Sequence, residues 1–212
     1  APGMGRLNCI TFHPSNPDII WVGAPAGGLW KTMDGGNSWT ALTDQLPNLG
    51  VSSVLVHPGD PNIMYMATGD GDGANTYSIG VLKSMDGGQT WNTTGLSTGV
   101  SERWRISELK MHPGNPDVIL GAFSRGIYKT TDAGANWTQT QSGGFKDIEV
   151  DPSNSGIWYA SATENGIYKS TDSGDTWTKL SSGLPASGFG RIAIAISPAA
   201  PNTIYALYVN QQ

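Results

Sequence analysis

The stretch that decides the fold is Lys31-Thr32-Met33-Asp34-Gly35-Gly36-Asn37-Ser38-Trp39. Its pattern, Ser/Thr-x-Asp-x-Gly-x-(Thr/Ser/Asn)-Trp, returns at residues 83–91, 129–137 and 169–177. Each copy follows a Gly and two apolar residues. An Asp and a Gly between two apolar runs predict a hairpin turn, in which the carboxylate accepts backbone N–H groups and Gly adopts a positive φ. Four copies in register indicate a repeat protein.

The Asp and the closing Trp of every copy are predicted to be structural. The carboxylate holds the turn, and the Trp ring is expected to be buried where the next strand begins. The eight residues are Asp34, Trp39, Asp86, Trp91, Asp132, Trp137, Asp172 and Trp177.

A second repeated element precedes each of these turns and occurs once more after the last. The first copy runs from Ile10 through Pro14 to Trp21, and the last runs from Ile194 to Tyr205. In all five copies the second and fourth residues before the first proline are apolar. This period of two predicts a strand with one buried face. The prolines predict a turn after that strand, because proline cannot donate to an interior ladder.

One unit therefore contains four short antiparallel strands, and radial repetition of such units predicts an all-β fold, a β-propeller. We expect a single domain over residues 1–212, with four-stranded blades at 5–46, 50–96, 103–142 and 145–184 and a half blade at 189–209. Because an incomplete blade leaves an open edge, we expect a segment of a larger propeller of seven or more blades. The remainder is expected from the same or another chain.

Composition limits the function classes. The 212 residues include 29 Gly and 13 Pro, which suits short strands and tight turns. The net charge of -5 disfavours nucleic acid or an anionic membrane surface as a partner, and no apolar run approaches the roughly 20 residues needed for membrane insertion. Cys9 is the only cysteine and is expected to pack in the core. Few Lys and many Trp and Thr residues favour a secreted or cell-surface protein.

The combined turns resemble those of the BNR/Asp-box propellers. These include sialidases, xyloglucan-degrading endoglucanases, sortilin-like ectodomains and secreted surface proteins of Bacteroidota. The resemblance covers essentially the whole chain and implies the fold rather than the function, because the Asp box is a turn device. It also implies active-site elements that are missing here. Pro25 stands where the xyloglucan-degrading enzymes carry a catalytic Asp, and the sialidase Arg-Ile-Pro element is absent. We therefore expect no catalytic residue in this chain.

Loop lengths indicate which end of the propeller varies. Strand alternation places the Pro-rich turns and the Asp boxes at one end, and the remaining loops at the other. From the first turn proline to the Asp-box Asp there are 28 residues in the second blade (58 to 86), against 19 or 20 in the others. The extra residues fall in the loop 68–79, and the adjoining link 97–105 is expected to be the longest between blades. We predict that these two loops lie side by side and bind a ligand.

The candidate ligand-binding residues are Tyr77, Glu102, Arg103, Trp104 and Arg105. A flat aromatic between two arginines could stack on a sugar ring or hold a carboxylate. The alternative is a Trp that covers the blade edge, with the arginine stems packed over it.

Asp70, Asp72 and Asn75 alternate with glycines in the loop 68–79, an arrangement of oxygen ligands that calcium favours. The full calcium loop with its closing Glu is absent, so a plain Gly/Asp-rich loop is the alternative. No other cofactor is expected. Three histidines occupy one slot in successive blades, so we expect them to serve the turns rather than share a metal. They are His13, His57 and His112.

The leading hypothesis is a non-catalytic Asp-box propeller segment of a secreted or cell-surface protein. It would bind a glycan or protein partner through the loops 68–79 and 97–105. The alternative is a glycoside hydrolase, xyloglucanase- or sialidase-like, whose catalytic residues lie partly outside this chain. A third possibility is a spacer without a ligand.

Overall fold

The computed structural model describes residues 5–73 and 76–210. The chain forms two compact units, residues 1–106 and 107–212. Among the described residues the regular structure is strand, apart from the short 3₁₀ helix η1 (Val100–Glu102). No helix in this part of the chain has the length and apolar character needed to cross a bilayer.

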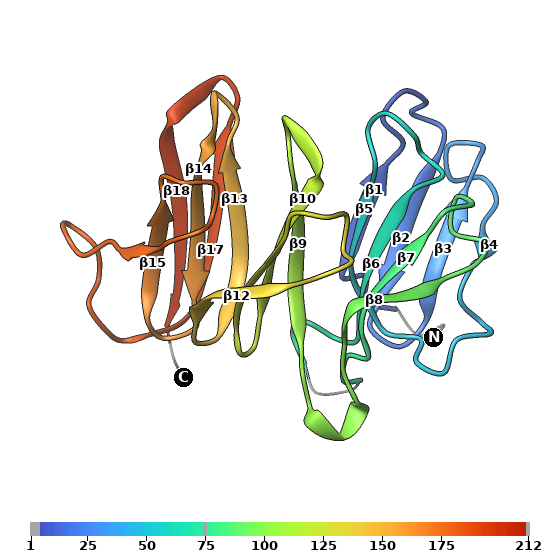
Figure 1. Ribbon diagram of the computed structural model, residues 1–212, viewed down its shortest axis with the longest axis horizontal. Helices are drawn as coiled ribbons and strands as arrows, with labels where there is room; N and C mark the ends of the chain where they lie inside the picture. The colour runs from blue at the N-terminus through green and yellow to red at the C-terminus, as the bar shows by residue number, and fades with distance from the viewer. Residues whose placement is uncertain (1–4, 74–75, 211–212) are drawn as a thin grey trace. The chain divides into compact units, whose positions relative to one another are not determined.

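The first unit contains two four-stranded antiparallel sheets, each in chain order (Figure 1). Inside this unit, β1 packs against β5, the first strand of the next sheet. The strands are β1 (Cys9–Phe12), β2 (Ile20–Ala24), β3 (Gly28–Thr32) and β4 (Thr40–Ala41), then β5 (Val51–Val56), β6 (Met64–Thr68), β7 (Gly80–Ser84) and β8 (Asn92–Ser97).

The second unit contains two further four-stranded sheets and a two-stranded sheet. Here too the first strands of neighbouring sheets pack together, β13 against β17 (Figure 1). The strands are β9 (Ile106–His112), β10 (Asn115–Phe123), β11 (Gly126–Thr130) and β12 (Thr138–Ser142), then β13 (Phe145–Asp151), β14 (Asn154–Ala162), β15 (Gly166–Ser170) and β16 (Thr178–Lys179), and finally β17 (Phe189–Ser197) and β18 (Ala200–Asn210). The predicted all-β class with four-stranded repeats is confirmed.

The core of each unit lies between consecutive sheets. In the second unit Ile148 of β13 and Trp158 of β14 are fully buried against Leu120 of β10. In the first unit Met64 of β6 packs in the same way against Trp21 of β2. The apolar alternation in the sequence thus provides the faces that join one sheet to the next.

The Asp box has the predicted turn chemistry. One oxygen of Asp34 accepts the Thr32 hydroxyl at 2.7 Å and the Ser38 backbone N–H at 2.9 Å, and the other oxygen accepts the Ser38 hydroxyl at 2.6 Å. Asp86, Asp132 and Asp172 repeat this arrangement. Each box is therefore a turn closed by its own carboxylate.

The Asp-box tryptophans are less uniformly buried than predicted. Trp91 and Trp177 pack against the hydrophobic cores of their units. Trp39 is 39% exposed, and its indole N–H donates to the Gly36 carbonyl. For Trp39 the prediction of a buried ring is wrong, because among the described residues of its unit no sheet precedes the one formed by β1–β4.

The histidines serve the Pro-rich turns, as predicted. The Nδ1 atom of His57 accepts the backbone N–H groups of Gly59 at 3.1 Å and Asp60 at 3.0 Å. His13 and His112 hold their own turns through the same ring nitrogen. Cys9 packs against the core of the first unit, as predicted. Burial raises the pKa of its thiol to about 11, so the thiol stays protonated and unreactive.

Acid should weaken the fold through the Asp boxes. Hydrogen bonds from the Thr90 hydroxyl, the Thr90 amide and the Ser84 hydroxyl lower the pKa of Asp86 to about 2. A depressed folded-state pKa gives stability that is present above the unfolded value and is lost as the pH falls through the folded value. We expect the melting temperature to fall between pH 4 and about 2, and to fall less steeply in Asp86→Asn. Circular dichroism melts across this range, with Asp44→Asn as the control, would show it; equal slopes would contradict it.

Candidate functional site

Loop lengths confirm one prediction and correct another. Eleven residues (69–79) connect β6 to β7, whereas two or three residues connect the second and third strands of the other four-stranded sheets. The link 98–105 has eight residues and is not the longest between sheets, since 42–50 and 180–188 have nine each. The error arose because β4 and β16 are only two residues long, so residues assigned to their blades belong to the links.

The loop 68–79 and the link 97–105 lie side by side, as predicted. The backbone N–H of Ser78 donates to the carbonyl of Trp104 at 2.9 Å. The hydroxyl of Thr98, in the link, donates to the Ser78 carbonyl at 3.0 Å. Ser78 is buried, so these bonds hold the two loops together at their base. We call the surface formed by residues 68–79 and 97–105 the two-loop surface.

The same loop also folds over the first sheet. The Thr76 hydroxyl donates to the Pro25 carbonyl at 2.6 Å, and the amide of Asn48 donates to the Tyr77 carbonyl. Gly69 N–H donates to the Gly50 carbonyl at 2.7 Å. The carbonyl of Pro25, just before β3, therefore receives a contact from this loop.

Asp70 forms a buried ion pair with Arg6. Its carboxylate is fully buried, whereas the Arg6 side chain is 46% exposed. Burial raises the pKa of Asp70, but hydrogen bonds from the Asp72 amide, the Arg6 guanidinium and the Gly73 amide lower it by more than burial raises it. The net shift of the pKa is therefore downward. A guanidinium on this carboxylate favours an ion pair over calcium, because a cation would have to displace it. Asn75 lies outside the described residues.

The residues predicted to bind ligand are distributed around η1. Arg103 ends that helix in the left-handed conformation, with φ of 57°, and its side chain is exposed. The Glu102 carboxylate accepts the Gly99 N–H at 2.8 Å and so closes the turn. Tyr77, Trp104 and Arg105 are half-buried. This surface therefore offers an exposed arginine beside partly covered aromatic rings.

Sequence reasoning missed a cluster of charged side chains on the first strands of two neighbouring sheets. Lys110 of β9 lies 3.3 Å from Glu108 and 2.9 Å from Glu149 of β13. Glu108 accepts the Ile148 N–H at 3.1 Å, and Asp147 accepts the Ile194 N–H of β17 at 2.8 Å. The signal was available, because Glu108-Leu109-Lys110 and Asp147-Ile148-Glu149 alternate charge with the buried apolar positions.

A hydrogen bond joins two carboxyl groups of this cluster, Glu108 and Asp147. Burial raises the pKa of Glu108 to about 8. The positive charge of Lys110 lowers this pKa, whereas a hydrogen bond with Asp147 and the negative charge of Asp147 raise it. Carboxyl groups that share a hydrogen bond are closer than the separation of about 5–9.5 Å used in glycoside hydrolysis. Three carboxyl groups could hold a metal, but the Lys110 ammonium already contacts two of them, Glu108 and Glu149. The ion pairs and hydrogen bonds of this cluster join the strands β9, β13 and β17.

The fold defines a class, a β-propeller segment, and the comparisons agree with that fold. No family model matches the chain. A xyloglucanase from Paenibacillus sp is 30% identical over 152 residues, 66% of this chain and 15% of that protein. A xyloglucanase from Acetivibrio thermocellus is 28% identical over 66% of this chain and 18% of its own length. A probable oligoxyloglucan-reducing end-specific xyloglucanase from Neosartorya fischeri is 27% identical over 76% and 22%. The chain thus spans about a fifth or less of these curated relatives.

Solved structures share the fold. An ancestral GH74 enzyme has a TM-score of 0.75 at 22% identity, covering 96% of this chain and 29% of that one. The GH74 xyloglucanase from Xanthomonas campestris has a TM-score of 0.70 at 21% identity, covering 89% and 32%. YCF48 with a bound peptide has a TM-score of 0.67 at 17% identity, covering 98% and 63%. At such identities these structures show the propeller fold alone.

Proposed function

We propose that this chain is a segment of a propeller glycoside hydrolase that acts on xyloglucan, and that it contributes polysaccharide binding rather than the catalytic carboxylates. The observation that carries the proposal is the similarity of two thirds of the chain to xyloglucanases. It favours the hydrolase alternative over a propeller without catalytic function. Xyloglucan is an extracellular polymer, so the protein would be secreted or displayed at the cell surface.

The geometry supports a binding role for this segment. The loop 68–79 and the link 97–105 are joined at Ser78, and they present Arg103 together with the partly covered rings of Tyr77 and Trp104. Aromatic faces and an arginine fork suit a hydroxyl-rich chain. Pro25 at the expected catalytic position agrees with catalysis elsewhere in the protein.

The natural full-length protein should release reducing ends from xyloglucan, and more slowly from a linear β-1,4-glucan. The 212-residue chain should be retarded in a xyloglucan affinity gel without cleaving the polymer. Arg103→Ala and Tyr77→Ala should each weaken retardation about tenfold, a typical effect of losing one good contact, whereas Arg191→Ala should not. A full-length protein inert on xyloglucan, with an unretarded chain, would refute the proposal.

A protein partner is the second candidate. YCF48 carries a peptide on the same fold, so a propeller of this kind can recognise a polypeptide. The two-loop surface would then be the first place to seek the contact. A pull-down would favour this candidate if it captured a protein whose binding xyloglucan blocks and Arg103→Ala abolishes.

We also propose that further blades cover the exposed apolar faces of the first and the last sheet. The argument rests on repeat positions. Ile10 is 58% exposed, although its counterparts are at most 5% exposed in the sheets that follow another sheet of the same unit; these are Val54, Ile148 and Ile194. The same apolar position is buried wherever a preceding sheet exists in its unit.

The opposite face gives the same result. Tyr205 of β18 is 61% exposed, and Leu207 beside it is 66% exposed. The counterparts of Tyr205 are at most 8% exposed in the sheets that another sheet of the same unit follows, namely Trp21, Leu120 and Tyr159. A blade of the same repeat chemistry fits each face, and it would come from the same or another chain.

A further inference from the structure

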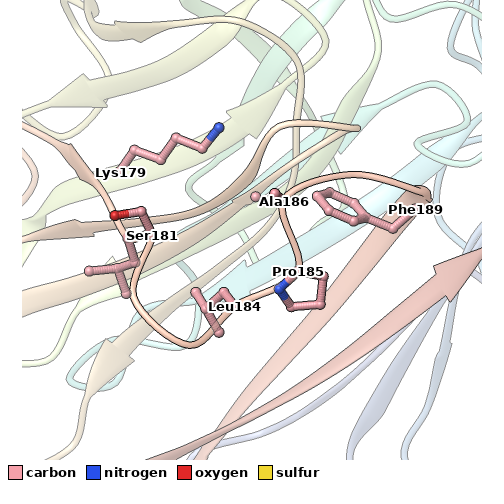
Figure 2. A pocket seen from close by; sticks show the side chains of 8 residues that line it. Lys179, Ser181, Leu184, Pro185, Ala186 and Phe189 are labelled. Atoms are coloured by element: carbon pink, nitrogen blue, oxygen red, sulfur yellow. The ribbon is translucent and has the colours of Figure 1, made fainter.

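A cavity of about 120 Å³ opens where β15 and β16 meet the link to β17 (Figure 2). Gly166 begins β15, Lys179 ends β16 and Phe189 begins β17, so the cavity lies at the loop end of the blade rather than at the Asp-box end. We propose that it binds one sugar ring of a neutral glycan. This inference rests on the proposed function and adds a subsite to it.

The size of the cavity selects a small ligand. At ~30 Å³ for each water, its volume corresponds to about four waters. Pockets that enclose whole drug-sized ligands have volumes of about 300–1,000 Å³. This space holds one face of a single ring at a chain end or branch, whereas several consecutive sugars of a polymer do not fit.

One wall of the cavity is apolar and held by the core. Figure 2 shows Leu184, Pro185, Ala186 and Phe189 following the curve of the link. Phe189 is buried and packs edge-on against Tyr208, with ring centroids 5.0 Å apart, and Leu184 packs on the same hydrophobic cluster. The part of the wall made by Phe189 and Leu184 is therefore formed before any ligand arrives, which reduces the entropy lost on binding. It offers a surface for the C–H face of a sugar.

The opposite side supplies fixed polar groups. The ammonium of Lys179 donates to the Asn165 side chain at 2.7 Å, and the Asn165 amide donates to the Tyr168 hydroxyl at 2.8 Å. The lysine stem crosses Gly166, where an added Cβ would lie 3.3 Å from Lys179 Cε. An ammonium has three donors, so Lys179 keeps hydrogen-bonding capacity for ligand hydroxyls besides its bond to Asn165. Ser181 adds an exposed hydroxyl at the rim.

The lining chemistry argues against other ligand classes. None of the residues that line the cavity is an Asp, Glu, His or Cys, so its side chains do not form a typical metal site. Lys179 is the one cation in the lining, and it already holds an amide oxygen, which is weak support for an anion. An apolar wall facing a few fixed donors is the arrangement that suits a small neutral polyol.

The test is NMR titration of the full chain with methyl β-D-glucopyranoside and methyl α-D-xylopyranoside at millimolar concentrations. At least one glycoside should shift the amide signals of residues 179–189. Ala186→Trp, which fills the cavity, should weaken binding at least tenfold. Ser182→Trp adds the same bulk to an exposed residue of the link that does not line the cavity, so it should bind as the unaltered chain does. Lys179→Met should also weaken binding while preserving the spectrum of the folded chain.

The outcomes separate the subsite from the proposed function when xyloglucan retardation is measured on the same samples. Glycoside shifts that persist in Ala186→Trp, or that occur only outside residues 179–189, would overturn the subsite. No glycoside binding by a chain that still binds xyloglucan would overturn the subsite and leave the proposed function standing. Cavity-dependent glycoside binding without any xyloglucan binding would support the subsite and count against the proposed function.

Discussion

Replacing Asp70 with alanine is expected to lower the free energy of unfolding by about 3 kcal/mol. The carboxylate is fully buried and is held by Arg6 and by the backbone N–H of Asp72. Removing it leaves these donors without their acceptor, and a buried ion pair that loses one partner typically costs 3–5 kcal/mol. We place the effect at the lower limit because Arg6 is 46% exposed and recovers part of its hydration. Chemical denaturation would measure the change.

Two controls sharpen this prediction. Asp72→Ala changes an exposed carboxylate in the same loop and should cost less than about 1 kcal/mol. Arg6→Ala should also destabilise, and the double variant Arg6→Ala/Asp70→Ala should cost less than the sum of the two single changes, since they remove one shared interaction. Strict additivity would show that the pair does not couple.

The same variants distinguish the ion pair from the predicted calcium site. If Arg6 is the partner of Asp70, added calcium should leave the melting temperature of the chain unchanged. A ligand that binds the folded state stabilises it according to its concentration and affinity. A calcium-dependent rise that disappears in Asp72→Ala would therefore favour the calcium site over the ion pair.

The fold could be predicted because its signals are local and repeated. An Asp box closes on itself within five residues, as the bonds from Asp34 to Ser38 show, so its chemistry is complete in the sequence. Four copies then set the blade boundaries. The extra loop 68–79 was found by counting residues between fixed landmarks. The link 180–188 was undercounted because strand length depends on pairing with β15, which the sequence pattern does not reveal.

The site could be predicted only in part because its contacts join distant residues. Arg6 and Asp70 are 64 residues apart; Arg6 precedes β1, and Asp70 lies in the loop that follows β6. Nothing in the local pattern distinguishes this pairing from a solvent-exposed arginine and a calcium-binding carboxylate. Glu108 and Asp147 were overlooked because the search for carboxylates covered the loops, whereas their strands bring them together near the inner edges of two sheets.

The cavity beside β16 shows the same limit. Lys179, Leu184 and Phe189 read in sequence as a strand end, a link and a strand start. They enclose a space only when the link curves back over Gly166. Sites formed by several loops require the positions of the blades, which the repeat pattern does not supply.

Replacing Trp21 with alanine is expected to cost about 4 kcal/mol of folding free energy. Its ring is 1% exposed and packs in the core that joins the first two sheets. It stacks on His13 with ring centroids 6.1 Å apart, and the Lys31 ammonium lies 5.1 Å from its centroid. Alanine would lose all these contacts and leave a cavity that neighbouring side chains fill only in part. Equilibrium denaturation followed by circular dichroism would measure the loss.

Tyr205 occupies the same repeat position and provides the matched control. In the 212-residue chain it is 61% exposed, so Tyr205→Ala should cost less than about 1 kcal/mol. If a further blade packs on this face, the same substitution in the complete protein should cost several kcal/mol, because the ring would then be as buried as Trp21. A small cost in both settings would mean that the β18 face stays open to solvent, and the proposed docking of another blade there would fail.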